Sequence, residues 1–442
     1  MKFGYISFDA TVRSYWENSW NGKALLNIGD AAEYRVVKQL YEKAGIPESG
    51  MKSIALPELI TYQGESLIVA LNIALDSYVG YNKILEDLSP DILPVFLGIS
   101  LTDTNLTERQ VQCLKCYAPI GCRDERTYLH LRNLGIPAYL NGCTASVLDI
   151  DAAAKKEYAD KIVFIDVPYA VAQHVPERLR SEIVFLSQEM YCRRDEAGDG
   201  FVPDQWADEV FACYNSKPRM IVTSRFHGAV LALAKNIPVA VTLERYTYRF
   251  SWLKNYVPIY TEETFEKIDW NPSAGNYDDT RRLILKTSQE RIMGEAKKYG
   301  DLLRLTDLQR TYLPAEASSS NQTHYYRRTW EKIKRTWDQN TEYAYAFWGV
   351  NENAQKLYEL ISRDFPMAKL TNIYDMFKTI EFGGIVSEHP ESIALNAGNP
   401  NFYVIVTAYL AARVAPDMCH GYGLSDERIF LCEREFVRQE DI

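Results

Sequence analysis

Short apolar runs alternate along the first 300 residues with longer segments in which apolar residues recur every three or four positions. Runs of about four to eight apolar residues predict buried strands, and the longer spacing predicts amphipathic helices. The strand-like runs are SLIVALNIAL, ILPVFLGISL, YAPIGC, KIVFIDVP, SEIVFLSQE, RMIVTS and IPVAVTL. Strands separated by helices of about 10–15 residues are typical of parallel α/β sheets, so we expect two successive Rossmann-like domains.

Local signals place the start of two helices. LLNIGDAAEYRVVKQLYEKAGI has the pattern of a loop that turns into a long helix. The strand YAPIGC ends near Arg123, Asp124 is placed to cap the following helix, and Gly135 is placed to end it. Each helix therefore opens on a short polar segment.

The repeating pattern also suggests where the domains lie. It restarts at ADKIVFIDVPY, which predicts an N-terminal domain over residues 1–154 and a second domain over 155–313. PAEASSSNQTH is rich in small polar residues, and we expect a linker over 314–330. Residues 331–442 would then form a smaller accessory module.

The accessory module shows the same strand, turn and helix order in EYAYAFWGVNENAQKLYELISRDFP and FYVIVTAYLAARVAPDMC. It is therefore predicted to be a degenerate Rossmann-like unit. A dinucleotide-binding turn needs small residues at three positions. Gly349 and Ala354 satisfy two of them, but Asn351 replaces the glycine that lets a pyrophosphate approach. We expect a structural or sugar-related module here rather than a nucleotide site.

Composition narrows the function. Hydrophobic residues make up 47% of the chain, which is typical of globular proteins, and 49 basic against 59 acidic residues give a net charge of −10. An acidic chain is a poor nucleic-acid binder, because such proteins neutralise phosphates with a basic surface. No signal peptide or apolar run of about 18 residues is evident, so we expect a cytoplasmic protein. That location includes peripheral association with the inner face of the membrane.

The eight cysteines are expected to be reduced thiols, since no secretion signal accompanies them. Cys113 and Cys116 form a CxxC, but neither a fourth ligand nor a thioredoxin-like context is evident. We therefore expect no metal site.

The segment IVTSRFHGAVLALAKN holds the first candidate chemistry. Arg225 and His227 fall where a strand should end and a helix begin, the position at which open parallel sheets bind anions. Strand alternation would place both on the same side, flanking Phe226, and Gly228 would let a ligand approach the backbone. The alternative is that both side chains pair with carboxylates at a sheet edge.

Two further junctions suggest the same chemistry. Arg123 and Asp124 follow the strand YAPIGC, and Asn27, Gly29 and Asp30 open the first long helix. Three such junctions in two successive domains suggest domains facing a cleft. Their cationic groups suit a small anion that carries phosphate or carboxylate.

The segments NIGDAA, GCRDERTYLHLRNLGIPAYLNGC and VTSRFHGAVLALAKNIPVAV resemble, in this order, motifs of the polysaccharide pyruvyl transferase family. The resemblance covers about residues 20–315. It implies a fold similar to the GT-B glycosyltransferases and transfer of pyruvyl from phosphoenolpyruvate to a sugar hydroxyl pair, as a cyclic ketal. The sugar would belong to a surface polysaccharide, such as an exopolysaccharide or capsule, or to its precursor. No cofactor is implied beyond the donor substrate.

The resemblance also implies roles for individual residues. The donor-binding arginines of the family fall on Arg123 and Arg225, and its histidine on His227; Phe226 stands where the family usually has leucine. His227 could donate a proton to carbon or to the leaving phosphate. Glu244, after the next strand, could accept the proton of the attacking hydroxyl or simply form a salt bridge.

The acceptor side is less closely matched. Asp30 could orient an acceptor hydroxyl or cap its helix. GISLTDTN replaces the family's serine- or glycine-rich stretch that ends in Gly-Pro, so the general acid and the acceptor site stay open.

Two other functions fit these residues. One is a nucleotide-sugar glycosyltransferase of the same architecture, because arginines and helix N-termini also bind diphosphates. The other is a non-catalytic family member within a polysaccharide assembly complex. The sequence does not indicate which sugar accepts the group, whether the acceptor is lipid-linked, or the oligomeric state.

Overall fold

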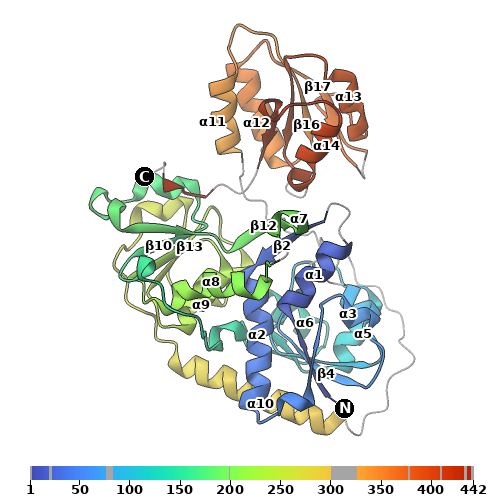
Figure 1. Ribbon diagram of the computed structural model, residues 1–442, viewed down its shortest axis with the longest axis vertical. Helices are drawn as coiled ribbons and strands as arrows, with labels where there is room; N and C mark the ends of the chain where they lie inside the picture. Colours follow the sequence, from blue (N-terminus) through green and yellow to red (C-terminus); the bar gives the residue numbers. More distant parts are fainter. Residues whose placement is uncertain are drawn as a thin grey trace. The chain divides into compact units, whose positions relative to one another are not determined.

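The computed structural model of the chain describes residues 2–18, 22–75, 83–198, 200–299, 326–376, 379–408, 411–432 and 436–439. The chain divides into two compact units, one of residues 1–319 with 437–442 and one of residues 320–436. Figure 1 shows the helices and strands of each unit. The elements predicted as parallel α/β sheets are confirmed in both.

The first sheet of the first unit is parallel throughout, in the order β3-β1-β4-β6. Its strands β4 and β6, with the sequences LIVAL and ILPVF, are buried at every position, as expected for a sheet covered on both faces. The strands of this half are β1 (Lys2–Ile6), β3 (Met51–Ile54), β4 (Leu67–Leu71), β5 (Ala74–Leu75), β6 (Ile92–Phe96), β7 (Ser100–Leu101), β8 (Ile120–Cys122) and β9 (Ala138–Leu140). The helices are α1 (Phe8–Asn18), α2 (Ile28–Lys43), α3 (Glu58–Thr61), α4 (Ile84–Asp87), α5 (Glu108–Cys116) and α6 (Glu125–Asn133).

The second sheet is also parallel, in the order β11-β10-β13-β14-β15. Its strands are β10 (Ile162–Ile165), β11 (Ile183–Leu186), β13 (Met220–Thr223), β14 (Val239–Leu243) and β15 (Ile259–Thr261). The helices are α7 (Arg194–Ala197), α8 (Pro203–Asn215), α9 (Phe226–Ala234) and α10 (Asp278–Tyr299). The first unit thus has two halves, each built on one of these sheets. One cluster of buried apolar side chains runs through both halves, from Val69 and Val95 to Val163 and Val230. The two sheets therefore share a core.

A two-stranded antiparallel ribbon also joins the halves. Strand β2 (Lys23–Asn27) pairs with β12 (Glu189–Arg193), so that Asn27 lies opposite Glu189. The prediction of a loop before α2 was wrong, because the strand that pairs with this segment lies far away in the sequence. The pairing sets the start of α2 beside the second sheet, where the Ile28 N–H donates to the Gln188 carbonyl over 3.0 Å.

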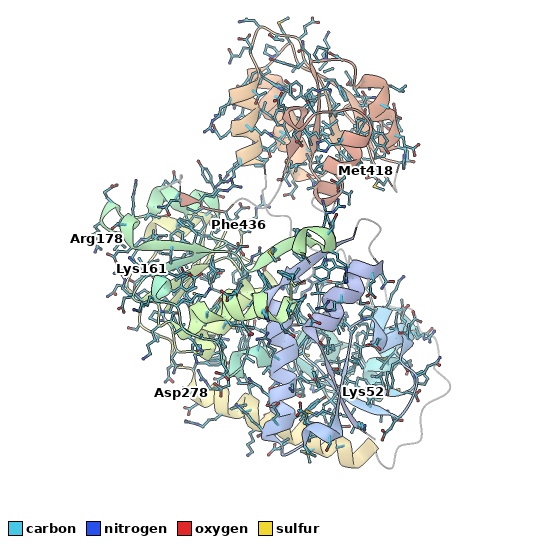
Figure 2. All side chains as sticks on the ribbon, viewed as in Figure 1. Lys52, Lys161, Arg178, Asp278, Met418 and Phe436 are labelled. Carbon is cyan, nitrogen blue, oxygen red and sulfur yellow. The ribbon has the colours of Figure 1, made fainter. Side chains whose placement is uncertain are left out.

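The second unit is a parallel sheet in the order β17-β16-β20-β21. Alternate residues of β16 enter two separate cores, with Tyr345 and Phe347 in one and Ala346 and Trp348 in the other. The strands are β16 (Ala344–Trp348), β17 (Lys369–Tyr374), β18 (Glu381–Phe382), β19 (Ile385–Val386), β20 (Phe402–Val406) and β21 (Ile429–Leu431). The helices are α11 (Arg327–Thr336), α12 (Glu352–Asp364), α13 (Ile393–Asn396) and α14 (Ala415–Gly421). Figure 2 shows the side chains that fill the space between these elements.

The turn before α12 is closed by the side chain of Asn351. Its Oδ1 atom accepts hydrogen bonds from the backbone N–H groups of Asn353 (2.9 Å) and Ala354 (3.2 Å). These are the N–H groups that a pyrophosphate would need at a helix start. Most of the segment predicted as a linker, 314–330, lies outside the described residues, and residues 327–330 belong to α11.

Candidate functional site

Helix α2 brings two carboxylates to the junction between the halves. Asn27 caps the helix, and its side-chain oxygen accepts a 2.8 Å hydrogen bond from the Gly29 N–H. Asp30 follows in the first turn and Glu33 lies one turn later, on the same face as Gly29. Negative charge in the first turn of a helix is stabilised by the helix dipole, so this end of α2 suits the carboxylate of Asp30.

Helix α9 begins sooner than the sequence suggested. Strand β13 ends at Thr223, Arg225 is the N-cap, and His227 is already in the first helical turn. The prediction that strand alternation places Arg225 and His227 on one side is therefore wrong. Gly228 lets the helix approach the strand end, because a Cβ atom there would lie 2.3 Å from the Thr223 hydroxyl oxygen.

Arg123 lies at the third junction and is almost completely buried, with 3% of its side chain exposed. Its backbone N–H donates to the Ile99 carbonyl over 2.8 Å. Its guanidinium contacts Glu33 Oε1 at 2.6 Å and donates to the Gly98 carbonyl over 3.2 Å. Asp124 caps α6 as predicted, accepting from the Thr127 N–H.

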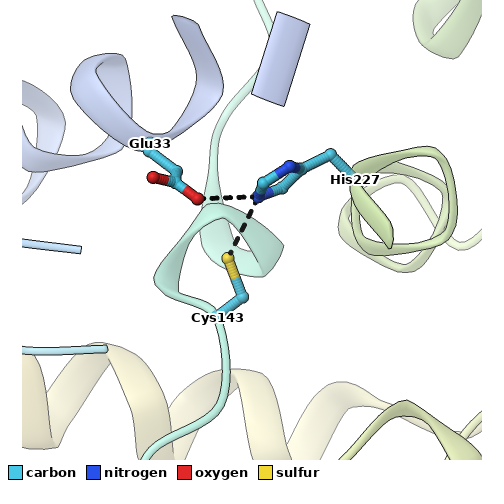
Figure 3. Close-up of side chains that lie close together, drawn as sticks. All are labelled: Glu33, Cys143 and His227. Atoms are coloured by element: carbon cyan, nitrogen blue, oxygen red, sulfur yellow. Dashed lines mark hydrogen bonds and ion pairs between the residues drawn. The ribbon is translucent and has the colours of Figure 1, made fainter. Parts of the chain in front are cut away.

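Residues from all three motif segments meet at His227. Its Nε2 atom lies 3.0 Å from Glu33 Oε1 and 3.7 Å from the Cys143 sulfur, and Figure 3 shows both atoms directed at that nitrogen. On the other side of the ring Gly29 is in close contact, since a Cβ atom there would lie 2.2 Å from Nδ1. We refer to Glu33, Arg123, Cys143 and His227 as the charged cluster.

Ionisation in the charged cluster is cooperative. Burial alone would lower the pKa of His227, but hydrogen bonds to Cys143 and Glu33 outweigh it and raise that pKa to about 9. Burial opposes ionisation of Glu33 and Cys143, yet Arg123 and His227 hold the pKa of each below its ordinary value. The charges of Arg123 and His227 thus favour the ionised forms of Glu33 and Cys143 inside the core.

Asp30 lies just outside this cluster and is partly exposed. Burial, then the charge of Glu33, raises the pKa of Asp30 to about 7, while His227 and Arg123 act in the opposite direction. Its carboxyl group therefore changes charge near neutral pH.

Arg225 binds a different pair of acids. Its Nε atom contacts Asp166 at 2.6 Å and an Nη atom contacts Glu189 at 2.6 Å, with 12% of the arginine side chain exposed. Asp166 follows β10 with a left-handed backbone, φ 49°, and its other contacts include the Gln188 N–H at 3.1 Å. The carboxylate pairing considered for this arginine from sequence is present.

The structure thus brings Gly29, Arg123 and His227 together, with Asp30 close enough to sense both charges. Phe226 packs edge-on against Phe250, and its ring lies 5.8 Å from the Arg123 guanidinium. Glu244 follows β14 and is partly exposed, and it is not a member of the charged cluster.

Sequence reasoning missed four residues that pair with the predicted ones, three acids and one thiol: Glu33, Asp166, Glu189 and Cys143. Glu33 was accessible from helical spacing, because it follows Gly29 by four positions. Asp166 ends the strand KIVFID, so the strand-end argument applied to it as well. Cys143 lies inside a quoted motif, but nothing in its spacing marks it. Glu189 had no local signal.

Glu33, Cys143 and His227 could also hold a metal ion, since one ligand atom of each lies within 4.8 Å of the others. Thiolate, imidazole and carboxylate are all zinc ligands. The Arg123 guanidinium, however, already contacts the same Glu33 oxygen and neutralises it. A second cation there would be repelled, so the contacts favour an ion-pair network. Among the helices that the structure describes, none is long and apolar enough to cross a membrane.

Comparison with known proteins agrees with the motifs. A search of curated proteins finds no match. The family model described as polysaccharide pyruvyl transferase matches residues 84–243, a span that contains Arg123, Cys143, Arg225 and His227. The resemblance seen in the sequence is therefore confirmed over residues 84–243, which match the model of this family and include strands of both sheets of the first unit.

Proposed function

We propose that this chain transfers the pyruvyl group of phosphoenolpyruvate to two hydroxyls of a polysaccharide sugar, or of its precursor, and so forms a cyclic ketal. The observation that carries the proposal is the convergence of three motif segments on His227, two of which lie within the family-matched residues 84–243. In this proposal the two sheets of the first unit form a GT-B-like arrangement with the donor between them.

The donor would bind at the start of α9. The first N–H groups of a helix have no partner within it, and together with the helix dipole they bind anions. Arg225, at the N-cap, is the more exposed of the two arginines and is suited to the phosphate or carboxylate of the donor. Arg123 would act indirectly, through its ion pair with Glu33, because its buried guanidinium already contacts that carboxylate.

The chemistry needs a proton at the methylene carbon and an attack by a hydroxyl at C2. An imidazole whose pKa is raised to about 9 is protonated at neutral pH, so His227 is suited to supply that proton. Asp30, beside the cluster, would orient the acceptor, and Glu244 would accept a hydroxyl proton. The second hydroxyl then displaces phosphate and closes the ketal.

The test is incubation with phosphoenolpyruvate and acceptors that contain galactose, mannose or N-acetylhexosamine, free and lipid-linked. We expect phosphate release that depends on acceptor, with a mass gain of one pyruvate less one water. His227→Ala should lower the rate by about 100- to 10,000-fold. The matched control is His389→Ala, a half-exposed histidine of the second unit, which should leave the rate within about twofold. Consumption of a nucleotide sugar with no use of phosphoenolpyruvate would instead identify a glycosyltransferase.

One observation favours a second candidate. Both arginines proposed for the donor are already paired with carboxylates, as in a structural network. A family member that no longer catalyses transfer and acts within a polysaccharide assembly complex would have such a network. It would release no phosphate with any acceptor, and His227→Ala would change its stability without changing any rate.

A further inference from the structure

Both contacts of His227 use one ring nitrogen. Glu33 Oε1 and the Cys143 sulfur lie 3.0 and 3.7 Å from Nε2, which has one hydrogen to donate. Figure 3 shows the two groups on the same side of the ring and Nδ1 on the other. The cluster therefore holds the imidazole by Nε2 and leaves Nδ1 for another partner.

Nδ1 faces the start of α2. A Cβ atom at Gly29 would lie 2.2 Å from it, so a side chain at this position would occupy the space that Nδ1 needs. Asn27 and Asp30, on either side of Gly29, are partly exposed, whereas Glu33 and Cys143 are buried. The Nδ1 side of the ring thus faces the helix start that carries these two partly exposed residues.

The charges behind the ring fix its orientation. Glu33 is 4% exposed and receives Arg123 and His227 on the same oxygen, so it cannot turn away without leaving a buried charge unpaired. Cys143 lies 3.7 Å from Nε2, and the charges of Arg123 and His227 both lower the pKa of its thiol. These contacts place Glu33 and Cys143 at Nε2 and favour a proton on each ring nitrogen.

We propose that Glu33 and Cys143 are positioning residues, which hold His227 by Nε2 and present Nδ1–H to the methylene carbon of the donor. This inference rests on the proposed function. The Nδ1 proton forms the new C–H bond, a hydroxyl oxygen supplies the electron pair at C2, and the proton of that hydroxyl, accepted by Glu244, returns to Nδ1. When the second hydroxyl attacks, the C–O bond to phosphate breaks and the phosphate takes the remaining proton.

The experiment measures phosphate release against pH for the full chain and for Glu33→Gln and Cys143→Ser. The rate of the unmodified chain should fall above pH about 9, as His227 loses its proton. With Glu33→Gln this alkaline limb should move toward the ordinary histidine pKa of about 6.5, so that the rate at pH 8 falls about 10- to 100-fold. At pH 6 most of the rate should return. The matched control is Glu42→Gln, an exposed acid of the same helix paired with Lys38, which should leave the profile unchanged.

A readout independent of turnover separates this inference from the proposed function. Nitrogen NMR of the labelled chain, with His227→Gln to assign the signal, follows the same titration without substrate. A lower imidazole pKa in Glu33→Gln supports positioning even if no acceptor is found; an unchanged pKa, or a rate lost equally at every pH, overturns it. Cys143→Ser keeps the Arg123–Glu33 pair and thus tests the inference if Glu33→Gln does not fold. It should shift the imidazole pKa downward, and no shift would remove Cys143 from the proposal.

Discussion

Replacing Gly29 by alanine tests the close approach of α2 to His227. The added Cβ atom would lie 2.2 Å from Nδ1 and 2.9 Å from Cε1 of the imidazole. Ordinary contact begins at about 3.4 Å, so the ring or the helix must move by about 1 Å. Because Nε2 is held at 3.0 Å from Glu33, a displacement of that size breaks the contact or strains the helix start.

The cost should appear mainly in activity. Overpacking of this kind costs about 1–3 kcal/mol, and the better helix propensity of alanine offsets up to about 1 kcal/mol. The net loss of unfolding free energy, up to about 3 kcal/mol, is smaller than the stability of an ordinary domain, which is about 5–15 kcal/mol. A catalytic group displaced by about 1 Å, in contrast, can lose about 100-fold in rate.

The assay is phosphate release from phosphoenolpyruvate with a competent acceptor, together with urea unfolding. The matched control is Gly294→Ala, because Gly294 also lies in a helix but has no atom within 4 Å of its added Cβ. That variant should keep its rate and gain up to about 1 kcal/mol. A rate for Gly29→Ala within twofold of the unmodified chain, with a normal unfolding curve, would refute the proposed contact between Gly29 and the working histidine.

Three further predictions follow from the same contacts. The stability of Asp30→Asn, compared with that of the unmodified chain, should be higher at pH 8 than at pH 5. Burial raises the pKa of Asp30 to about 7, so between about pH 4 and 7 the folded state keeps a proton that the unfolded state releases. The unmodified chain therefore loses stability as the pH rises through that window, whereas the asparagine variant does not. Unfolding at the two pH values measures this, and an equal difference at both would contradict it. Arg123→Leu should cost about 3–5 kcal/mol, because it removes one of the two cationic partners of the buried Glu33 and leaves His227 as the other. Arg123→Leu with Glu33→Leu should recover part of the loss; additive costs in a double-mutant cycle would show that the pair is not coupled. Arg225→Lys should raise KM for phosphoenolpyruvate more than it lowers kcat, because a lysine has one ammonium group for Asp166, Glu189 and the donor; an unchanged KM would remove Arg225 from the donor site.

Local pattern was enough for most elements. The helix start at Asn27, the cap at Asp124 and the strand before Arg225 all depend on neighbours within a few positions, and the structure has them where the sequence indicated. Strand β2 was missed since its partner β12 lies more than 160 positions later, and a lone short apolar run does not show whether it will pair. The side-chain direction of His227 was predicted wrongly from strand alternation, because α9 begins one residue before it.

The sequence by itself determined the parallel α/β elements, the polar residues at their carboxyl ends and the family motif. These follow from side-chain periodicity, from capping and from the order of short segments. Only the tertiary structure decided which of those residues meet. It brings Glu33, Arg123, Cys143 and His227 into one buried cluster, and it pairs Arg225 with Asp166 and Glu189. The physical reason is that a charge buried at the junction of two sheets must be neutralised by whatever group the fold brings within about 3 Å, and that group can come from any part of the chain.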